Sequence, residues 1–220
     1  MNRVIYYIVT FVYFCALPLY GQAFEADSSV CKDTIRARGS NNYPPFEFIN
    51  EKGQPDGFNV EIFKAVMKTV GLHYEIRLGE WDEVMDDVCH NRADALVGMI
   101  YSKERAANVR FCLPHCSVNR NIICRQDNDF KTVESIRGKE IIVQKGGWSH
   151  NYVMDHHLTD KVIVVEDMAA ALKLLNDGNH DVAIGSDLVA LSVIKAGSYD
   201  NLTIHPMKIE PQTYSIVVSK

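Results

Sequence analysis

Apolar residues follow two different periods in the first half of the chain. Between Phe58 and Val70 they recur every three or four positions, and Gly71 follows, so we expect a helix over 58–70. A second, shorter helix is expected over 81–88. Apolar runs that are typical of strands occupy 34–38, 73–78 and 93–99. The order strand, helix, strand, helix, strand predicts an α/β lobe with a mostly parallel sheet.

The second half repeats this order of elements without repeating its sequence. Strands are expected at 140–144, 162–165, 181–184 and 202–205, and helices at 149–157, 168–175 and 188–195. The extended segment 111–125 lies between the halves, and a last strand is expected at 214–219. We therefore expect lobe I at 24–117, a crossover or hinge at 118–125, lobe II at 126–208 and a return strand to lobe I within 209–220.

Residues 1–23 have the layout of a secretory signal peptide. Arg3 supplies a positive charge, the run 4–20 is apolar and uncharged, and small residues at 21 and 23 suit a signal peptidase. We expect cleavage after about Ala23 and export from the cytoplasm. The alternative is a retained membrane anchor, for which the run is short.

Five of the six cysteines lie beyond the expected cleavage point: Cys31, Cys89, Cys112, Cys116 and Cys124. An exported chain can form disulfides, and an odd number leaves at least one thiol unpaired. Cys31 and Cys89 are one possible pair, but spacing does not decide the connectivity. Cys112, His115 and Cys116 have a spacing that faintly resembles a metal site. They lie in an apolar, strand-like run, so we expect buried cysteines and no metal.

Composition and charge exclude several classes of protein. The 220 residues are 47% hydrophobic, enough for one or two compact cores. The formal net charge is −5, and no block of Lys and Arg is present that could follow a phosphate backbone, so we expect no nucleic-acid partner. No phosphate loop, Ser/His/Asp set or paired-carboxylate signature is present, so the sequence predicts neither a cofactor nor catalytic residues.

Short motifs follow one another in order along the mature chain. They read Asn-Tyr-Pro-Pro-Phe-Glu at 42–47, Pro-Asp-Gly-Phe-Asn-Val-Glu at 55–61, Ala-Asp-Ala-Leu at 93–96 and Gly-Met-Ile-Tyr-Ser-Lys-Glu-Arg at 98–105. In this order they resemble the bacterial extracellular solute-binding proteins of family 3, the polar amino-acid binders of bacterial importers. The resemblance implies a two-lobed α/β fold of the type II periplasmic binding proteins, a Venus flytrap that closes on a small amino-acid-like ligand.

The resemblance implies a binding site in the first lobe. Arg105 offers the planar, two-donor guanidinium that binds a carboxylate well. Residues before it, Met99, Tyr101 and Ser102, are expected to contribute to the same pocket, with the Ser102 hydroxyl beside the anion. The alternative for Arg105 is a surface arginine paired with Glu104. Further ligand contacts are expected from two aromatic side chains on a proline-stiffened loop, Tyr43 and Phe46. Phe46 is alternatively a core residue, with Tyr43 alone reaching the cleft.

The second lobe departs from the family pattern. The loop after Lys145 usually offers a threonine to the carboxylate, and here it reads Gly-Gly-Trp-Ser-His from 146. Backbone N–H groups of Gly147, Trp148 and Ser149 are expected to replace that contact. The Trp148 side chain is a wall of the ligand pocket, a contact between the lobes or a half-buried packing residue. Asp187 is the candidate partner for a ligand ammonium group. Its alternative role is to cap the following helix.

Three functions agree with these features. The first is an extracytoplasmic receptor that serves an ABC-type importer. The second is the ligand-sensing ectodomain of a membrane histidine kinase, because the segments 98–102 and 145–152 resemble variants in sensor domains. The third is a periplasmic dehydratase on the same fold. Family members continue for about two helices beyond the final strand, which lobe I lacks here, so we expect a shortened chain or a piece of a longer receptor. A binding protein, not an enzyme, is the expectation.

Overall fold

A computed structural model describes residues 34–209 and 211–220 of the chain. The expected signal peptide at 1–23 and Cys31 lie outside the described residues. Among the described residues, none of the helices is both long and apolar enough to cross a bilayer.

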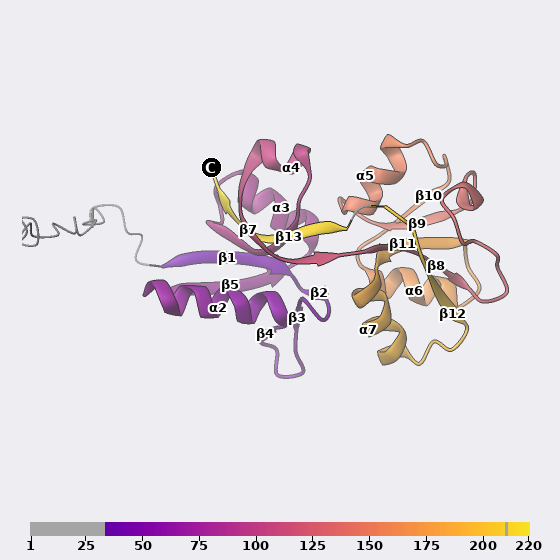
Figure 1. Cartoon of the computed structure of the whole chain (residues 1–220). Helices are drawn as coiled ribbons and strands as arrows, with labels where there is room; N and C mark the ends of the chain where they lie inside the picture. The colour runs from indigo at the N-terminus through magenta and orange to yellow at the C-terminus, as the bar shows by residue number, and fades with distance from the viewer. Residues whose placement is uncertain (1–33, 210) are drawn as a thin grey trace, which may run out of the picture. The chain divides into compact units, whose positions relative to one another are not determined.

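The first lobe is a five-stranded sheet with the strand order β5-β1-β6-β13-β7 (Figure 1). β1 runs parallel to β5 and β6, whereas β13 is antiparallel to both β6 and β7. A small sheet, β2-β3-β4, lies beside it. The bounds are β1 (Ile35–Ser40), β2 (Asn42–Tyr43), β3 (Glu47–Ile49), β4 (Pro55–Asp56), β5 (Tyr74–Gly79), β6 (Ala95–Ile100), β7 (Val109–Val118) and β13 (Gln212–Ser219).

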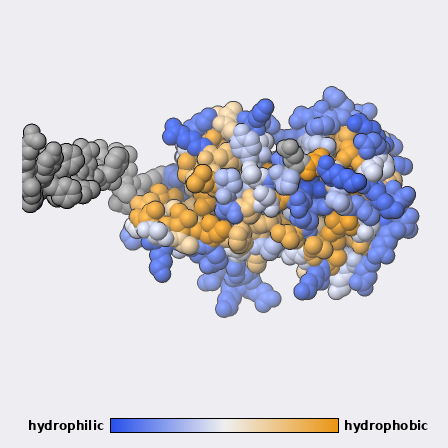
Figure 2. Space-filling view, viewed as in Figure 1, coloured by the Kyte–Doolittle hydropathy of each residue, from blue (hydrophilic) through white to orange (hydrophobic). Residues whose placement is uncertain are grey.

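Helices cover both faces of this sheet. Ala95 and Val97 of β6 pack in one apolar cluster with residues of α2 (Phe58–Val70), and Leu96 packs in another with residues of α3 (Trp81–Cys89). Burial on both faces explains the continuous apolar run of β6. A short helix, α4 (Lys103–Asn108), follows this strand. Figure 2 shows apolar side chains gathered over the outer part of the first lobe. Among the exposed apolar residues of this lobe are Val66 and Val70 of α2.

The second lobe has the strand order β10-β9-β11-β8-β12. β9 is parallel to β10 and β11, and β8 is antiparallel to β11 and β12. Its elements are β8 (Arg120–Arg125), a 3-10 turn at Glu134–Ile136, β9 (Ile141–Gln144), α5 (Trp148–Asp155), β10 (Val162–Val165), α6 (Met168–Asn176), β11 (Val182–Ser186), α7 (Asp187–Gly197) and β12 (Leu202–Pro206). Two α/β lobes with mostly parallel sheets are thus confirmed, because in each sheet four of the five strands run in the same direction and a single strand, β13 or β8, runs opposite to them.

Two segments connect the lobes. The chain passes from β7 to β8 through Asn119 and returns from β12 to β13. Most of the range that we expected as a crossover, 120–125, is therefore a strand of the second sheet. The reason is backbone hydrogen bonding: β8 lies between β11 and β12 and pairs with both, which no local pattern reveals.

Candidate functional site

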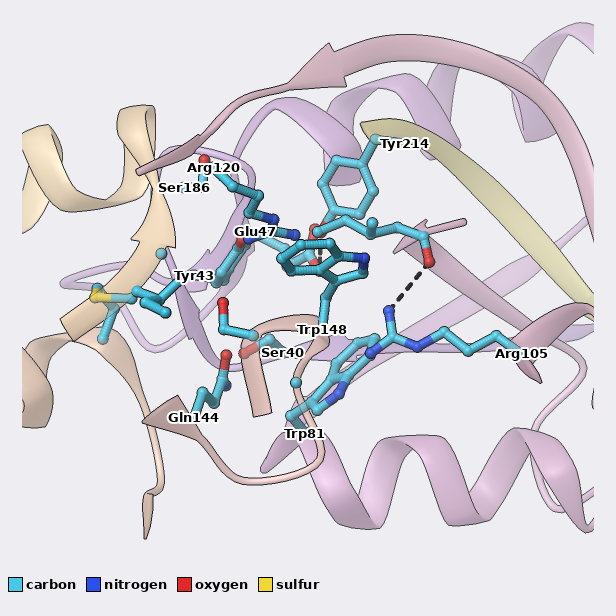
Figure 3. A pocket seen from close by; sticks show the side chains of 16 residues that line it. Ser40, Tyr43, Glu47, Trp81, Arg105, Arg120, Gln144, Trp148, Ser186 and Tyr214 are labelled. Carbon is cyan, nitrogen blue, oxygen red and sulfur yellow. Dashed lines mark hydrogen bonds between the residues drawn. The ribbon is translucent and has the colours of Figure 1, made fainter. Parts of the chain in front are cut away.

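A pocket in the cleft is lined by residues of both lobes (Figure 3). The first lobe contributes the ends of β1, β2 and β6, the starts of β3 and α3, and residues of α4 and β13. The second lobe contributes the start of β8, the loop between β9 and α5, and the end of β11. The lining residues are Ser40, Tyr43, Glu47, Trp81, Ile100, Arg105, Arg120, Gln144, Gly147, Trp148, Ser149, Met168, Ile184, Gly185, Ser186 and Tyr214.

Arg105 enters the pocket from α4. The side chain of Ser102 caps this helix by accepting the N–H of Arg105 at 3.2 Å, which fixes the start of the turn. The Arg105 side chain is buried, with 6% of the residue exposed, and its guanidinium carbon lies 5.3 Å from the ring centroid of Trp81. Nη1 donates to the carbonyl of Ile100 at 3.0 Å, and Nη2 to the carbonyl of Gly146 in the second lobe at 3.2 Å.

Arg105 is a cation at neutral pH in spite of its surroundings. Burial, and secondly the nearby positive charge of Arg120, lower its pKa to about 10. No ion pair joins it to a carboxylate of the described residues. The guanidinium has five N–H donors, and only two of its hydrogen bonds are to the protein. The remaining N–H groups are suited to bind a ligand carboxylate.

Glu47 lies at the other wall of the pocket and is fully buried. The amide of Asn59 donates to one carboxyl oxygen, and the hydroxyl of Tyr214 donates to the other at 3.0 Å. His115 Nε2 lies 2.9 Å from Asn59 Oδ1, so the ring donates to that amide. Burial raises the pKa of Glu47 to about 7, although these hydrogen bonds act in the opposite direction.

Gly98 is the position that allows this network. A Cβ on Gly98 would overlap the amide nitrogen of Asn59 and come within 3.2 Å of a carboxyl oxygen of Glu47. Both neighbours are buried and held by hydrogen bonds, so they have little freedom to move aside. Close packing of Asn59 and Glu47 in the pocket wall therefore requires glycine at position 98, the first residue of the 98–105 motif.

The loop between β9 and α5 brings the second lobe against Arg105. Gly146 adopts a left-handed φ of 61°, which favours glycine, and turns its carbonyl toward the first lobe. That carbonyl accepts hydrogen bonds from Arg105 and from Nε1 of Trp81, the latter at 3.2 Å. Gly147 precedes the first turn of α5, where Trp148 and Ser149 lie with backbone N–H groups that have no partner within the helix.

The lobes are closed on each other in this structure. Lys145 forms an ion pair with Asp82 at 2.5 Å across the cleft. Asn42 donates to a carboxyl oxygen of Asp167 at 2.6 Å, and Asn151 donates to Glu104 at 3.0 Å. Apolar side chains of both lobes also pack in one cluster, with Phe46 and Tyr214 from the first lobe and Met168 from the second.

Of the residues expected at the site, Tyr43, Arg105, Gly147, Trp148 and Ser149 line the pocket. Ser102 holds α4 through its cap and does not line the pocket itself. Phe46 lies in the core behind Tyr43, with 5.9 Å between the two ring centroids.

Three expected residues lie away from the pocket. Met99 is completely buried between β6 and α3 because its side chain projects into the core cluster of that face. Tyr101 is 43% exposed and packs against Phe111, since it has left the strand. Asp187 begins α7 and accepts a hydrogen bond from Asn119 at 3.0 Å, whereas its neighbour Ser186 lines the pocket.

Arg120, Glu47, Tyr214 and Trp81 are pocket residues that the sequence did not assign to the ligand site, although Glu47 belongs to the motif at 42–47. Arg120 is a charged residue at the head of an apolar strand, and Glu47 lies between two phenylalanines in a stiff loop; both are weak signals of a buried functional charge. Nothing near Tyr214 in the sequence indicates its role.

The Cys112, His115 and Cys116 motif does not converge on one point. Cys112 is exposed, and His115 is bound to Asn59. No group of three metal-ligating side chains is close enough to hold an ion within the part of the chain that the structure describes. Cys89, at the end of α3, is not bonded to another cysteine of the described residues, and Cys31, with which it could pair, lies outside them.

The bacterial extracellular solute-binding proteins, family 3, match residues 35–201, so this chain belongs to that family. The crystal structure of a histidine kinase sensor domain with similarity to periplasmic binding proteins superimposes with a TM-score of 0.83 at 30% identity, covering 86% of this chain and 84% of that one. The two-lobed solute-binding fold is thereby confirmed.

Two curated relatives show the range of this family. ABC transporter arginine-binding protein 1 of Escherichia coli strain K12 is 26% identical over 157 residues, which is 71% of this chain and 64% of that protein. Cyclohexadienyl dehydratase of Pseudomonas aeruginosa is 24% identical over 169 residues, which is 74% of this chain and 63% of the enzyme. The chain therefore spans less than two thirds of the length of either relative.

Proposed function

We propose that this chain binds an amino acid or a similar small carboxylate in the pocket between its lobes, outside the cytoplasm, and serves an ABC-type importer. The observation that carries the proposal is the buried guanidinium of Arg105, which faces the pocket without a carboxylate partner among the described residues. The family and its arginine-binding relative support the same class of ligand.

Binding and closure are coupled because the site is divided between the lobes. Arg105 belongs to the first lobe, and the backbone N–H groups at the start of α5 belong to the second. A carboxylate between them contacts both only when the cleft is closed. The ligand therefore shifts the population toward the closed state by its extra contacts there. The partner reads this closed shape.

A sensor ectodomain is the second candidate function. The similarity to a histidine kinase sensor domain favours it, with 30% identity over 86% of this chain. The importer component and the sensor ectodomain would use the same ligand site. They differ in the partner that recognises the closed conformation, a membrane transporter or a histidine kinase. Uptake of radiolabelled ligand that disappears on deletion of the gene supports the importer; unchanged uptake with a lost transcriptional response to the ligand supports the sensor.

An enzyme is the third possibility, because a dehydratase is among the relatives. Glu47 is buried, and its oxygens already accept hydrogen bonds from Asn59 and Tyr214. We therefore assign it to the pocket wall and assign no reaction to the chain. Turnover of a cyclohexadienyl substrate by the purified protein would contradict this assignment.

A thermal-shift screen against amino acids and small carboxylates tests the proposed function. A ligand at about 100 times its dissociation constant stabilises the folded state by about 2.7 kcal/mol. In a chain of this size that corresponds to a rise in Tm of roughly 5–10 °C. We expect such a rise with at least one member of the panel. No rise with any of them would contradict the proposal.

A further inference from the structure

Each lobe presents one arginine stacked on a tryptophan to the same pocket (Figure 3). The guanidinium of Arg105 lies over Trp81 in the first lobe. In the second lobe, the guanidinium carbon of Arg120 lies 5.1 Å from the ring centroid of Trp148. Arg120 is as deeply buried as Arg105, with only 5% of the residue exposed. The pocket thus contains two fixed positive charges, one from each side of the cleft.

The two arginines differ in how their donors are used. Arg105 donates to two backbone carbonyl groups. By contrast, Nε and Nη2 of Arg120 are buried and have no acceptor within the described residues. These two atoms lie on one edge of the guanidinium and form the fork that binds a carboxylate through two parallel hydrogen bonds. A buried charge without a partner is unfavourable by several kcal/mol, so its retention in the pocket wall points to an anionic ligand.

No acidic side chain of the pocket neutralises this second charge. Glu47 is the single carboxyl group among the lining residues, and both of its oxygens accept hydrogen bonds from Asn59 and Tyr214. Asp187, which we expected to meet a ligand ammonium, is turned to Asn119 instead. The other polar lining groups are neutral: Ser40, Gln144, Ser149 and Ser186. The described pocket therefore favours negative over positive groups.

We propose that the ligand is a small dianion, a dicarboxylate whose first carboxylate is held by Arg105 and whose second is held by Arg120. This inference rests on the proposed function and names the substrate class of the same site. The ligand is an acidic amino acid if an amino group is accepted, and a simple dicarboxylic acid if it is not. A basic side chain would face Arg120 and be repelled, so the specificity differs from that of the arginine-binding relative.

The test compares four probes by calorimetry: L-glutamate, succinate, L-glutamine and L-arginine. We expect glutamate or succinate to bind at least about 30-fold more tightly than glutamine, because glutamine replaces the second carboxylate by a neutral amide. Arginine is expected to bind more weakly than glutamine. Tight glutamate binding with weak succinate binding identifies an amino dicarboxylate, and the reverse identifies a simple dicarboxylic acid.

Arg120→Gln should then bring the affinity for the dicarboxylate to within a few-fold of that for glutamine. Arg110→Gln is the matched control, because Arg110 is an exposed arginine on β7. Arg120→Met keeps the length of the stem without the charge, and it should lose the same preference. Thermal melting of each variant without ligand checks that it folds. Arg120→Gln and Arg120→Met are expected to be at least as stable as the original chain, because they lack the buried unpaired charge.

The outcomes separate this inference from the proposed function. If glutamine or arginine binds as tightly as the dicarboxylates and binding still depends on Arg105, the dianion is ruled out and the proposed function stands. The same holds if Arg120→Gln leaves the preference unchanged. If none of the four probes, and no other amino acid or small carboxylate, binds, then the proposed function fails as well.

Discussion

Arg105→Ala is expected to weaken binding of the carboxylate ligand by about 30-fold or more, while the chain still folds. Loss of one partner of a buried, hydrogen-bonded charge pair weakens binding by about 2–5 kcal/mol, and 1.4 kcal/mol corresponds to a factor of ten. The fold should survive because the side chain donates only to two carbonyl groups and its burial is itself unfavourable.

Calorimetric titration of the variant measures this effect directly. Lys103→Ala is the matched control, because Lys103 lies in the same short helix and is exposed. Circular dichroism melting of both variants without ligand separates lost binding from lost folding. Affinity in Arg105→Ala within a few-fold of the original chain would show that another group holds the carboxylate.

The second large effect is a fall in stability as Glu47 ionises. Its pKa is about 7 in the folded chain, against 4.5 for an ordinary glutamate, so the folded state holds this proton more tightly than the unfolded state does. The folded state thus binds more protons between pH 4.5 and 7, and stability falls as the pH rises through that range. From pH 5 to pH 8 this one group should destabilise the fold by about 2–3 kcal/mol.

Glu47→Gln removes this titration and preserves the shape of the side chain. The amide oxygen can accept from Asn59, and the amide nitrogen can donate to the hydroxyl of Tyr214. Urea unfolding at pH 5 and pH 8 should show the variant gaining about 2–3 kcal/mol relative to the original chain at the higher pH. Other titrating groups, such as His115, are present in both chains and largely cancel in the difference. Glu51→Gln, on an exposed turn, is the control.

Parallel pH dependence in the original chain and in Glu47→Gln would contradict this account of the buried carboxyl. It would mean that Glu47 is ionised at pH 5 in the folded state, which its burial beside the apolar rings of Phe46 and Tyr214 opposes.

Much of the fold follows from local pattern. The helix predicted over 58–70 has those bounds in the structure, because its apolar spacing is regular and Gly71 ends it in a left-handed conformation. The strand at 162–165 is equally well placed. The helix α4 was missed because it has only six residues, too few to show a period. The strand β8 was missed because its partners, β11 and β12, lie far along the chain.

The site was less predictable than the fold, for a physical reason. Arg105 is found because it belongs to a contiguous motif. Arg120 lies on β8 and Tyr214 on β13, the strands that follow the first and the second connection between the lobes. Their positions in the pocket therefore depend on how the two lobes are joined, which the local sequence does not show. The side-chain direction of Met99 was misjudged because a strand turns successive residues to opposite faces, and the pattern does not fix which face meets the cleft. Tyr101 was misjudged because the strand ends one residue before it, at Ile100.

A crystal structure with the ligand found in the screen tests the central claim most directly. We expect one ligand enclosed by both lobes, with a carboxylate whose oxygens lie about 2.7–3.1 Å from the guanidinium nitrogens of Arg105. A ligand bound outside the pocket between the lobes, or one whose carboxylate is held without Arg105, would contradict it.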